Sequence, residues 1–112
     1  ARDHGVMIIP GEEAARNGER GLRAFVRKLG GAPAYVSFDI DCVDPAFAPG
    51  TGTPSVGGLT SAQALELVRS CAGANVVGGD VVEVLPDRDH AGITALLAAH
   101  IAFEIICLTT FS

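Results

Sequence analysis

The alternation of hydrophobic and polar positions predicts the first elements of the chain. Residues 5–9 form an apolar run closed by a Pro-Gly pair, which is typical of a buried strand. In residues 12–29 the apolar side chains recur at the spacing of one helix face, and a Gly-Gly pair follows. We therefore expect a strand and then an amphipathic helix.

The middle of the chain has the pattern of a strand, a loop and a second helix. Residues 34–41 are rich in β-branched and aromatic side chains, which predicts a strand. Residues 42–59 hold four glycines and three of the six prolines, so they predict a long ordered loop. Thr60 and Gln63 match a capping box, which predicts that a helix begins directly after this loop.

The last third of the chain predicts a strand and a helix that are apolar throughout. Residues 75–85 are a nearly continuous apolar run, typical of a parallel strand covered on both faces. A final helix from about residue 91 to 108 is apolar almost all round. Because His100 and Glu104 would be costly in lipid, we expect this helix to pack against the sheet or a neighbouring subunit, and we expect no membrane partner.

The predicted order is β-α-β-loop-α-β-α, which favours an α/β fold with a parallel sheet. With 112 residues the chain is one domain at most. Eight basic against thirteen acidic residues give a net charge of −5 without a basic run, so we expect no nucleic-acid partner. Three widely spaced cysteines fit free thiols in a reducing compartment, and no basic-then-apolar leader opens the chain. These features predict a cytoplasmic protein.

Two carboxylates at the end of the second predicted strand are candidates for metal binding. Asp39 and Asp41 are two residues apart, and alternate positions of a strand point to the same side. In α/β proteins, ligands bind at the carboxyl ends of parallel strands. Two close carboxylates repel each other, and a divalent cation such as Mg²⁺ or Mn²⁺ relieves that repulsion. Capping or solvated aspartates are the alternative, and phosphoryl- and glycosyl-transfer enzymes also use this spacing.

The residues around this pair resemble a known family. Residues 37–54, with the sequence Ser-Phe-Asp-Ile-Asp-Cys-Val-Asp-Pro-Ala-Phe-Ala-Pro-Gly-Thr-Gly-Thr-Pro, are similar to the signature of the ureohydrolase family, which includes arginase and agmatinase. Residues 57–60 and 80–86 are similar to that family in the same order and at similar separations, and so are residues 93–96 and 103–104. The resemblance covers nearly the whole chain.

The resemblance implies a hydrolase that splits a guanidino group into urea and an amine at a binuclear metal site, normally with two Mn²⁺ ions. By position in the motif, Asp39 and Asp41 would be two of the metal ligands. Glu83 would hold the substrate guanidinium, because a carboxylate can accept two parallel N–H bonds from that planar group. Thr53 would lie near the bound guanidinium and could hydrogen-bond to it.

The same resemblance implies an arginase-like fold, which is a three-layer α/β/α arrangement around a parallel sheet. Residues 1–112 would be the C-terminal β-α-β-α-β-α portion of a single ureohydrolase domain whose upstream half is absent. Gly50 takes a place where arginases usually carry alanine, which favours an agmatinase-like substrate and an amine product such as putrescine. Homo-oligomers, either trimers or hexamers, are implied as well.

The other polar residues have simpler interpretations. Asp44, which precedes a proline, is expected to fix the loop rather than to bind metal. Asp80 is at odd parity from Glu83 in the strand and is expected to be structural or to support the ligands. His100 and Glu104, one helical turn apart, predict a contact on a helix face rather than a ligand pair. Cys42 has no flanking base that would make its thiol reactive.

The sequence also departs from the family. Two ligand segments, Gly-Gly-Asp-His and Asp-Ala-His-x-Asp, are missing from it. Asp3 and His4 do not replace them, because they stand where the family has a variable polar pair. We therefore assign no catalytic residue and expect the 112 residues alone to be inactive. Alternative substrates are guanidinobutyrate, guanidinopropionate or a formimino compound, and the alternative class is a non-catalytic module that serves as an oligomer interface or regulatory remnant.

Overall fold

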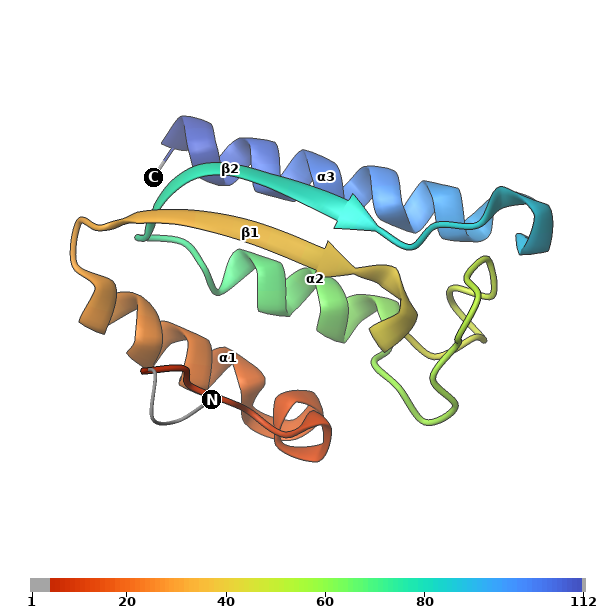
Figure 1. Cartoon of the computed structure of the whole chain (residues 1–112), viewed down its shortest axis with the longest axis horizontal. Helices are drawn as coiled ribbons and strands as arrows, with labels where there is room; N and C mark the ends of the chain where they lie inside the picture. Colours follow the sequence, from red (N-terminus) through yellow and green to blue (C-terminus); the bar gives the residue numbers. More distant parts are fainter. Residues whose placement is uncertain (1–4, 112) are drawn as a thin grey trace.

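The structure, a computed structural model, describes residues 5–111, the last of them by its backbone only. Asp3 and His4 lie outside these residues. Three α-helices, two strands and two short 3-10 helices follow one another along the described part of the chain (Figure 1). In order they are α1 (Gly11–Leu29), β1 (Pro33–Asp39), η2 (Ile40–Cys42), α2 (Ser61–Arg69), β2 (Asn75–Val82), η3 (Pro86–Arg88) and α3 (Ile93–Phe111).

The two strands lie side by side and run parallel, with α2 as the crossover between them. Their register runs from Pro33 opposite Asn75 to Asp39 opposite Val82, with one irregularity between Ala34 and Tyr35. Because both strands run the same way, their carboxyl ends meet at one edge of the sheet. The structure thus confirms the predicted α/β class with parallel strands.

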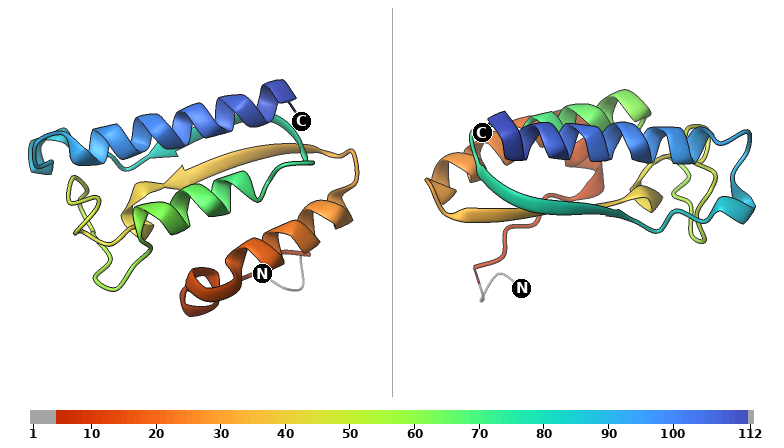
Figure 2. Two further views of the ribbon diagram at one scale, coloured as in Figure 1. Left: turned by 180° about the vertical axis from the view of Figure 1, so that it is seen from behind. Right: turned by 90° about the horizontal axis from the view of Figure 1, so that it is seen from above.

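The helices cover one face of this sheet. Along β1, Ala34, Val36 and Phe38 are partly or fully buried, whereas Tyr35 and Ser37 on the alternate positions are exposed. Viewed from above, α2 and α3 lie on the same side of the strands, and α1 lies beyond α2 (Figure 2). Residues 5–111 therefore supply two of the three expected layers, and the opposite sheet face is open.

The predicted first strand is wrong. Residues 5–9 form no strand, and Val6, Met7 and Ile8 are 43–57% exposed. A strand needs a neighbour to pair with, and the described residues offer none to this run, which lies beside α1 instead (Figure 1). Its one anchored side chain is Ile9, which lies so close to α1 that a Cβ on Gly21 would be 2.7 Å from the Ile9 Cδ1.

The core lies between the sheet and the pair of helices α2 and α3. Gly79 in β2 allows the close approach of α3, since a Cβ there would be 2.6 Å from the Ile105 Cγ2 atom. The buried apolar residues of this core include Phe38, Ile40, Val43, Ala64, Val68, Val76, Leu97, Ile101, Ile105 and Leu108. The apolar face of each of these elements thus packs against a neighbouring element, as the sequence pattern predicts for residues 61–108.

The helix α3 is long and apolar enough to cross a bilayer, with a mean hydropathy of 1.8 over Ile93–Thr110. One of its faces, however, packs on β2 and α2 through the core residues. Glu104 on α3 forms an ion pair with Arg69 on α2, with the Nη2 and Oε1 atoms 2.6 Å apart. These contacts join one face of α3 to the core, while Leu96, Phe103 and Ile106 on its outer face are about 60% exposed.

Candidate active site

The first candidate residues lie where β1 ends. The strand stops at Asp39, two residues earlier than predicted, and the chain turns at once into η2. The Asp39 Oδ1 atom accepts the backbone N–H of Asp41 at 3.1 Å and so caps this 3-10 turn. Both aspartates therefore lie at the carboxyl edge of the sheet, but a side-chain cap rather than strand alternation places them there.

The loop after η2 returns to this pair and brings Thr53 with it. The Thr53 hydroxyl donates a hydrogen bond to the Asp41 Oδ2 atom at 3.0 Å. Asp44 holds the loop in shape, since its two carboxylate oxygens accept the backbone N–H groups of Ala46 at 2.8 Å and Gly57 at 2.9 Å. The expectation that Asp44 fixes the loop is confirmed, and a direct contact joins Thr53 to Asp41.

Glu83 lies at the same edge, directly after β2. Its neighbour Val82 is the register partner of Asp39, so the carboxyl edge of the sheet carries all four candidate residues. The backbone of Glu83 has a φ of 72°, in the left-handed region that non-glycine residues seldom adopt. Such backbone strain persists only where surrounding contacts impose it, and it is concentrated at functional sites. The side chain is exposed, and within residues 5–111 no hydrogen bond joins it to the other three.

Cys42 adjoins the aspartates without adding a reactive group. Burial, and then the negative charges of Asp39 and Asp41, raise the pKa of the Cys42 thiol to about 11. The thiol therefore stays protonated near neutral pH and is a poor nucleophile. The raised pKa is consistent with the lack of a flanking base for Cys42 in the sequence.

Asp80 stabilises the pairing of the two strands on the open sheet face. Its carboxylate accepts hydrogen bonds from the Ser37 hydroxyl at 2.6 Å and from the Tyr35 hydroxyl at 2.8 Å. These two bonds, first that of Ser37 and then that of Tyr35, lower the pKa of Asp80 below its usual value. Of the two roles expected for Asp80, the contacts show the structural one.

The two aspartates offer the kind of ligand that a divalent cation prefers, but they are too few to fill its coordination shell. The Asp39 Oδ1 atom accepts the N–H of Asp41, and the Asp41 Oδ2 atom accepts the hydroxyl of Thr53. The Asp39 Oδ2 and Asp41 Oδ1 atoms therefore remain as hard oxygen donors. An octahedral Mn²⁺ or Mg²⁺ needs six ligands, and in the described part of the chain no group of three or more His, Cys, Asp or Glu side chains comes together. The predicted helix-face contact between His100 and Glu104 is not found among the described residues, where Glu104 instead accepts hydrogen bonds from Arg69 of α2.

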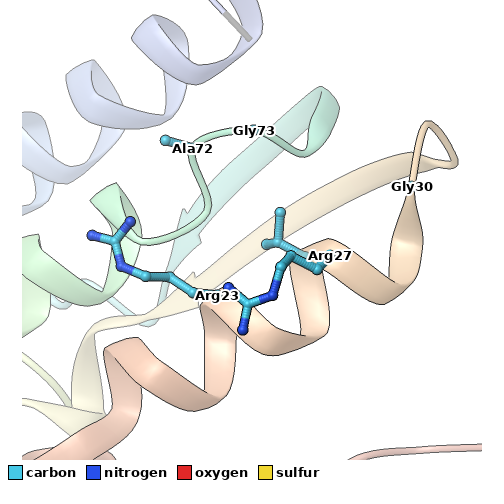
Figure 3. Close-up of a pocket in the computed structure, with 6 residues that line it drawn as sticks. Arg23, Arg27, Gly30, Ala72 and Gly73 are labelled. Carbon is cyan, nitrogen blue, oxygen red and sulfur yellow. The ribbon is translucent and has the colours of Figure 1, made fainter.

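A hollow of about 340 Å³ lies at the other end of the strands. Arg23 and Arg27 on α1 border it together with the Ala72–Gly73 turn that leads into β2 (Figure 3). The two arginine side chains leave α1 in different directions, so they do not converge on one ligand (Figure 3). This hollow is thus separate from the carboxyl edge where the candidate residues gather.

Sequence reasoning missed the residues that hold the Thr53 loop. Asp89 and Thr94, at the start of α3, contact this loop through Gly50. An aspartate shortly before an apolar helical run is a helix-start signal, and Asp89 carries it. The sequence alone could have revealed the cap in this way, but not its contact with a loop about 40 residues upstream.

The fold and the site together define a class: an α/β protein with parallel strands whose carboxyl edge presents carboxylates suited to cations. A model of the family described as the arginase family matches residues 1–108. The chain belongs to the arginase family.

Known relatives extend this result. The chain is 56% identical to an agmatinase of Chromobacterium violaceum over 105 residues, which are 93% of this chain and 33% of the relative. It is 48% identical to a guanidinobutyrase of Pseudomonas aeruginosa over 96% of this chain and 34% of the relative. The solved proclavaminate amidino hydrolase of Streptomyces clavuligerus is similar with a TM-score of 0.87 and 47% identity, over 96% of this chain and 37% of that one. The chain thus spans about a third of the length of these relatives.

Proposed function

We propose that the chain provides the carboxyl-edge part of the active site in an agmatinase-like ureohydrolase, which hydrolyses a guanidino compound to urea and an amine. The contact between Thr53 and Asp41, at the edge where Asp39 and Glu83 also lie, carries the proposal. The similarity to an agmatinase and a guanidinobutyrase supports the guanidino group as the part of the substrate that reacts.

Each candidate residue has a distinct task. Asp39 and Asp41 would each offer one carboxylate oxygen to Mn²⁺, and the hydrogen bond from Thr53 fixes the rotation of the Asp41 carboxylate. Glu83 would accept two N–H bonds from the planar guanidinium and so orient its carbon. The metal ions, when bound, activate water for hydrolysis near neutral pH. Two aspartates cannot complete a binuclear site, so we expect the 112 residues alone to be inactive.

Agmatine is the substrate that we propose first, with guanidinobutyrate as the alternative. Gly50, at a place where arginases usually carry alanine, favours agmatine, and the similarity to a guanidinobutyrase supports the alternative. We further propose a cytoplasmic protein that forms trimers or hexamers. The exposed apolar residues Leu96, Phe103 and Ile106 favour a second function, a non-catalytic interface module, which the activity test separates from the enzyme.

The test begins with the protein at the length at which its source produces it, established by intact mass. Urea release from agmatine and guanidinobutyrate is then measured with and without added Mn²⁺, beside the Asp39→Ala and Asp41→Ala variants. We expect Mn²⁺-dependent urea release in the wild type and none in either variant. A wild type that releases no urea from any guanidino compound, or an aspartate variant with wild-type activity, would contradict the proposal.

A further inference from the structure

The loop that carries Thr53 is fastened to the start of α3. Thr94, the second residue of α3, is fully buried, and its Oγ1 atom accepts the backbone N–H of Gly50 at 2.8 Å. The carbonyl oxygen of Gly50 accepts the N–H of Leu85 at 2.7 Å. Both backbone polar groups of Gly50 therefore find their partners in the segment that joins β2 to α3.

Asp89 fixes Thr94 in turn. Its Oδ1 atom accepts the backbone N–H of Thr94 at 2.9 Å and its Oδ2 atom that of Ala95 at 3.0 Å, which caps the helix. Gly50 packs directly against this cap, since a Cβ there would lie 2.9 Å from the Asp89 Cβ and 3.0 Å from the Thr94 Oγ1. A residue larger than glycine would thus push the loop away from α3.

The loop between Gly50 and Thr53 has little hold of its own. Thr51 is 1% exposed, yet within residues 5–111 its hydroxyl has no hydrogen-bond partner. The carbonyl of Gly52 accepts a bond from the Arg88 Nη1 atom at 3.2 Å, which again comes from the segment before α3. One backbone hydrogen bond within the loop, from the Thr51 N–H to the Pro49 carbonyl at 2.9 Å, supports this conformation, and residues 85–94 supply the contacts at Gly50 and Gly52.

We propose that Thr94 and Asp89 are positioning residues for the candidate active site. They hold the backbone of Gly50 in place. Through the loop they thereby fix the position of Thr53, whose hydroxyl donates a hydrogen bond to the Asp41 carboxylate. Neither residue is hydrogen-bonded to Asp39 or Asp41 in the described part of the chain. The expected effect of these residues on catalysis rests on the proposed function, whereas their effect on the position of the loop does not.

The placement is tested first, by amide hydrogen exchange in the protein at its native length. Thr94→Val keeps the shape but removes the Oγ1 acceptor, Thr94→Ser retains it, and Thr109→Val removes a hydroxyl that bonds only within α3, to the Ile106 carbonyl. We expect exchange at residues 50–53 to rise about tenfold or more in Thr94→Val only, as for a lost buried hydrogen bond. Unchanged exchange at residues 50–53 in a folded Thr94→Val protein would overturn the proposal.

A second variant keeps the test decisive if Thr94→Val does not fold. Gly50→Ala keeps the side chains of both Asp89 and Thr94 but forces the loop and the cap of α3 apart, because its Cβ would lie 2.9 Å from the Asp89 Cβ. We expect faster exchange at residues 50–53, with wild-type protection in the part of α3 beyond its first turn. Wild-type protection of residues 50–53 in Gly50→Ala would show that contact with the cap does not hold the loop.

The catalytic consequence is measured by steady-state urea release from agmatine. We expect kcat to fall about 10- to 100-fold in Thr94→Val with a smaller change in KM, as for a displaced active-site group, and Thr94→Ser to restore it. A Thr94→Val protein with a loosened loop and wild-type kcat would overturn the positioning role. If the wild type hydrolyses no guanidino compound, the proposed function fails, while the exchange experiment still decides how the loop is held.

Discussion

The left-handed backbone of Glu83 predicts that one substitution raises stability and removes function together. A non-glycine residue in this conformation costs about 1–2 kcal/mol, which glycine does not incur. The Glu83 side chain is exposed, so its removal loses little packing. Glycine also gives the unfolded chain about 0.4–1 kcal/mol of additional freedom, which offsets part of the gain. Glu83→Gly should therefore increase the free energy of unfolding by about 0.8 kcal/mol, the middle of a range from about 0 to about 1.6 kcal/mol.

The assay compares urea-denaturation midpoints with rates of hydrolysis of a guanidino substrate. Glu83→Gln keeps the backbone strain, so its midpoint should equal that of the wild type, whereas guanidinium binding should weaken with the metal content intact. Ala91→Gly is the matched control, because Ala91 has a φ of 52° and is exposed. It should gain stability by the same relief of backbone strain.

Two results would refute this reasoning. A Glu83→Gly protein no more stable than Glu83→Gln would show that the positive φ stores no strain. Wild-type hydrolysis by either variant would remove Glu83 from the site that binds the guanidinium.

Three further predictions follow from the contacts. Thr51→Val should leave the free energy of unfolding within about 0.5 kcal/mol of the wild type or raise it, because within residues 5–111 the buried hydroxyl has no hydrogen-bond partner to lose. A loss above about 1 kcal/mol in chemical denaturation would show that the hydroxyl does form a hydrogen bond. Asp39→Ala and Asp41→Ala should abolish Mn²⁺-dependent urea release, whereas Asp44→Ala should mainly lower the melting temperature; loss of metal dependence in Asp44→Ala with unchanged melting would reverse these roles. The pKa of Asp80 is lowered in the folded state, so its stabilising effect is present above about pH 4 and fades as the pH falls through the folded-state pKa. Stability measured against falling pH should therefore decrease less steeply in Asp80→Asn than in the wild type. An unchanged slope would contradict the stabilising role of the Asp80 carboxylate.

Local sequence signals predicted those elements whose partners lie close in the chain. The capping box is present, with the Thr60 N–H donating to the Gln63 Oε1 at 2.9 Å and the Gln63 N–H donating to the Thr60 Oγ1 at 3.1 Å. The end of β1 was misplaced because the Asp39 carboxylate offers the backbone a turn that competes with the strand. The motif pointed to Asp39, Asp41, Thr53 and Glu83, but no local pattern could reveal the strained backbone at Glu83.

The errors about burial have one physical cause. An apolar run in the sequence predicts that its side chains will be buried, but it does not indicate which element buries them. Residues 75–85 have the pattern of a strand covered on both faces, yet Val77, at the register irregularity of β2, is 63% exposed, and Tyr35 on the open sheet face is 62% exposed. Residues 5–9 and the outer face of α3 carry apolar side chains in the same way. The relatives named above are about three times as long as this chain. An apolar pattern therefore identifies these segments as apolar faces, but the described residues do not contain what covers them.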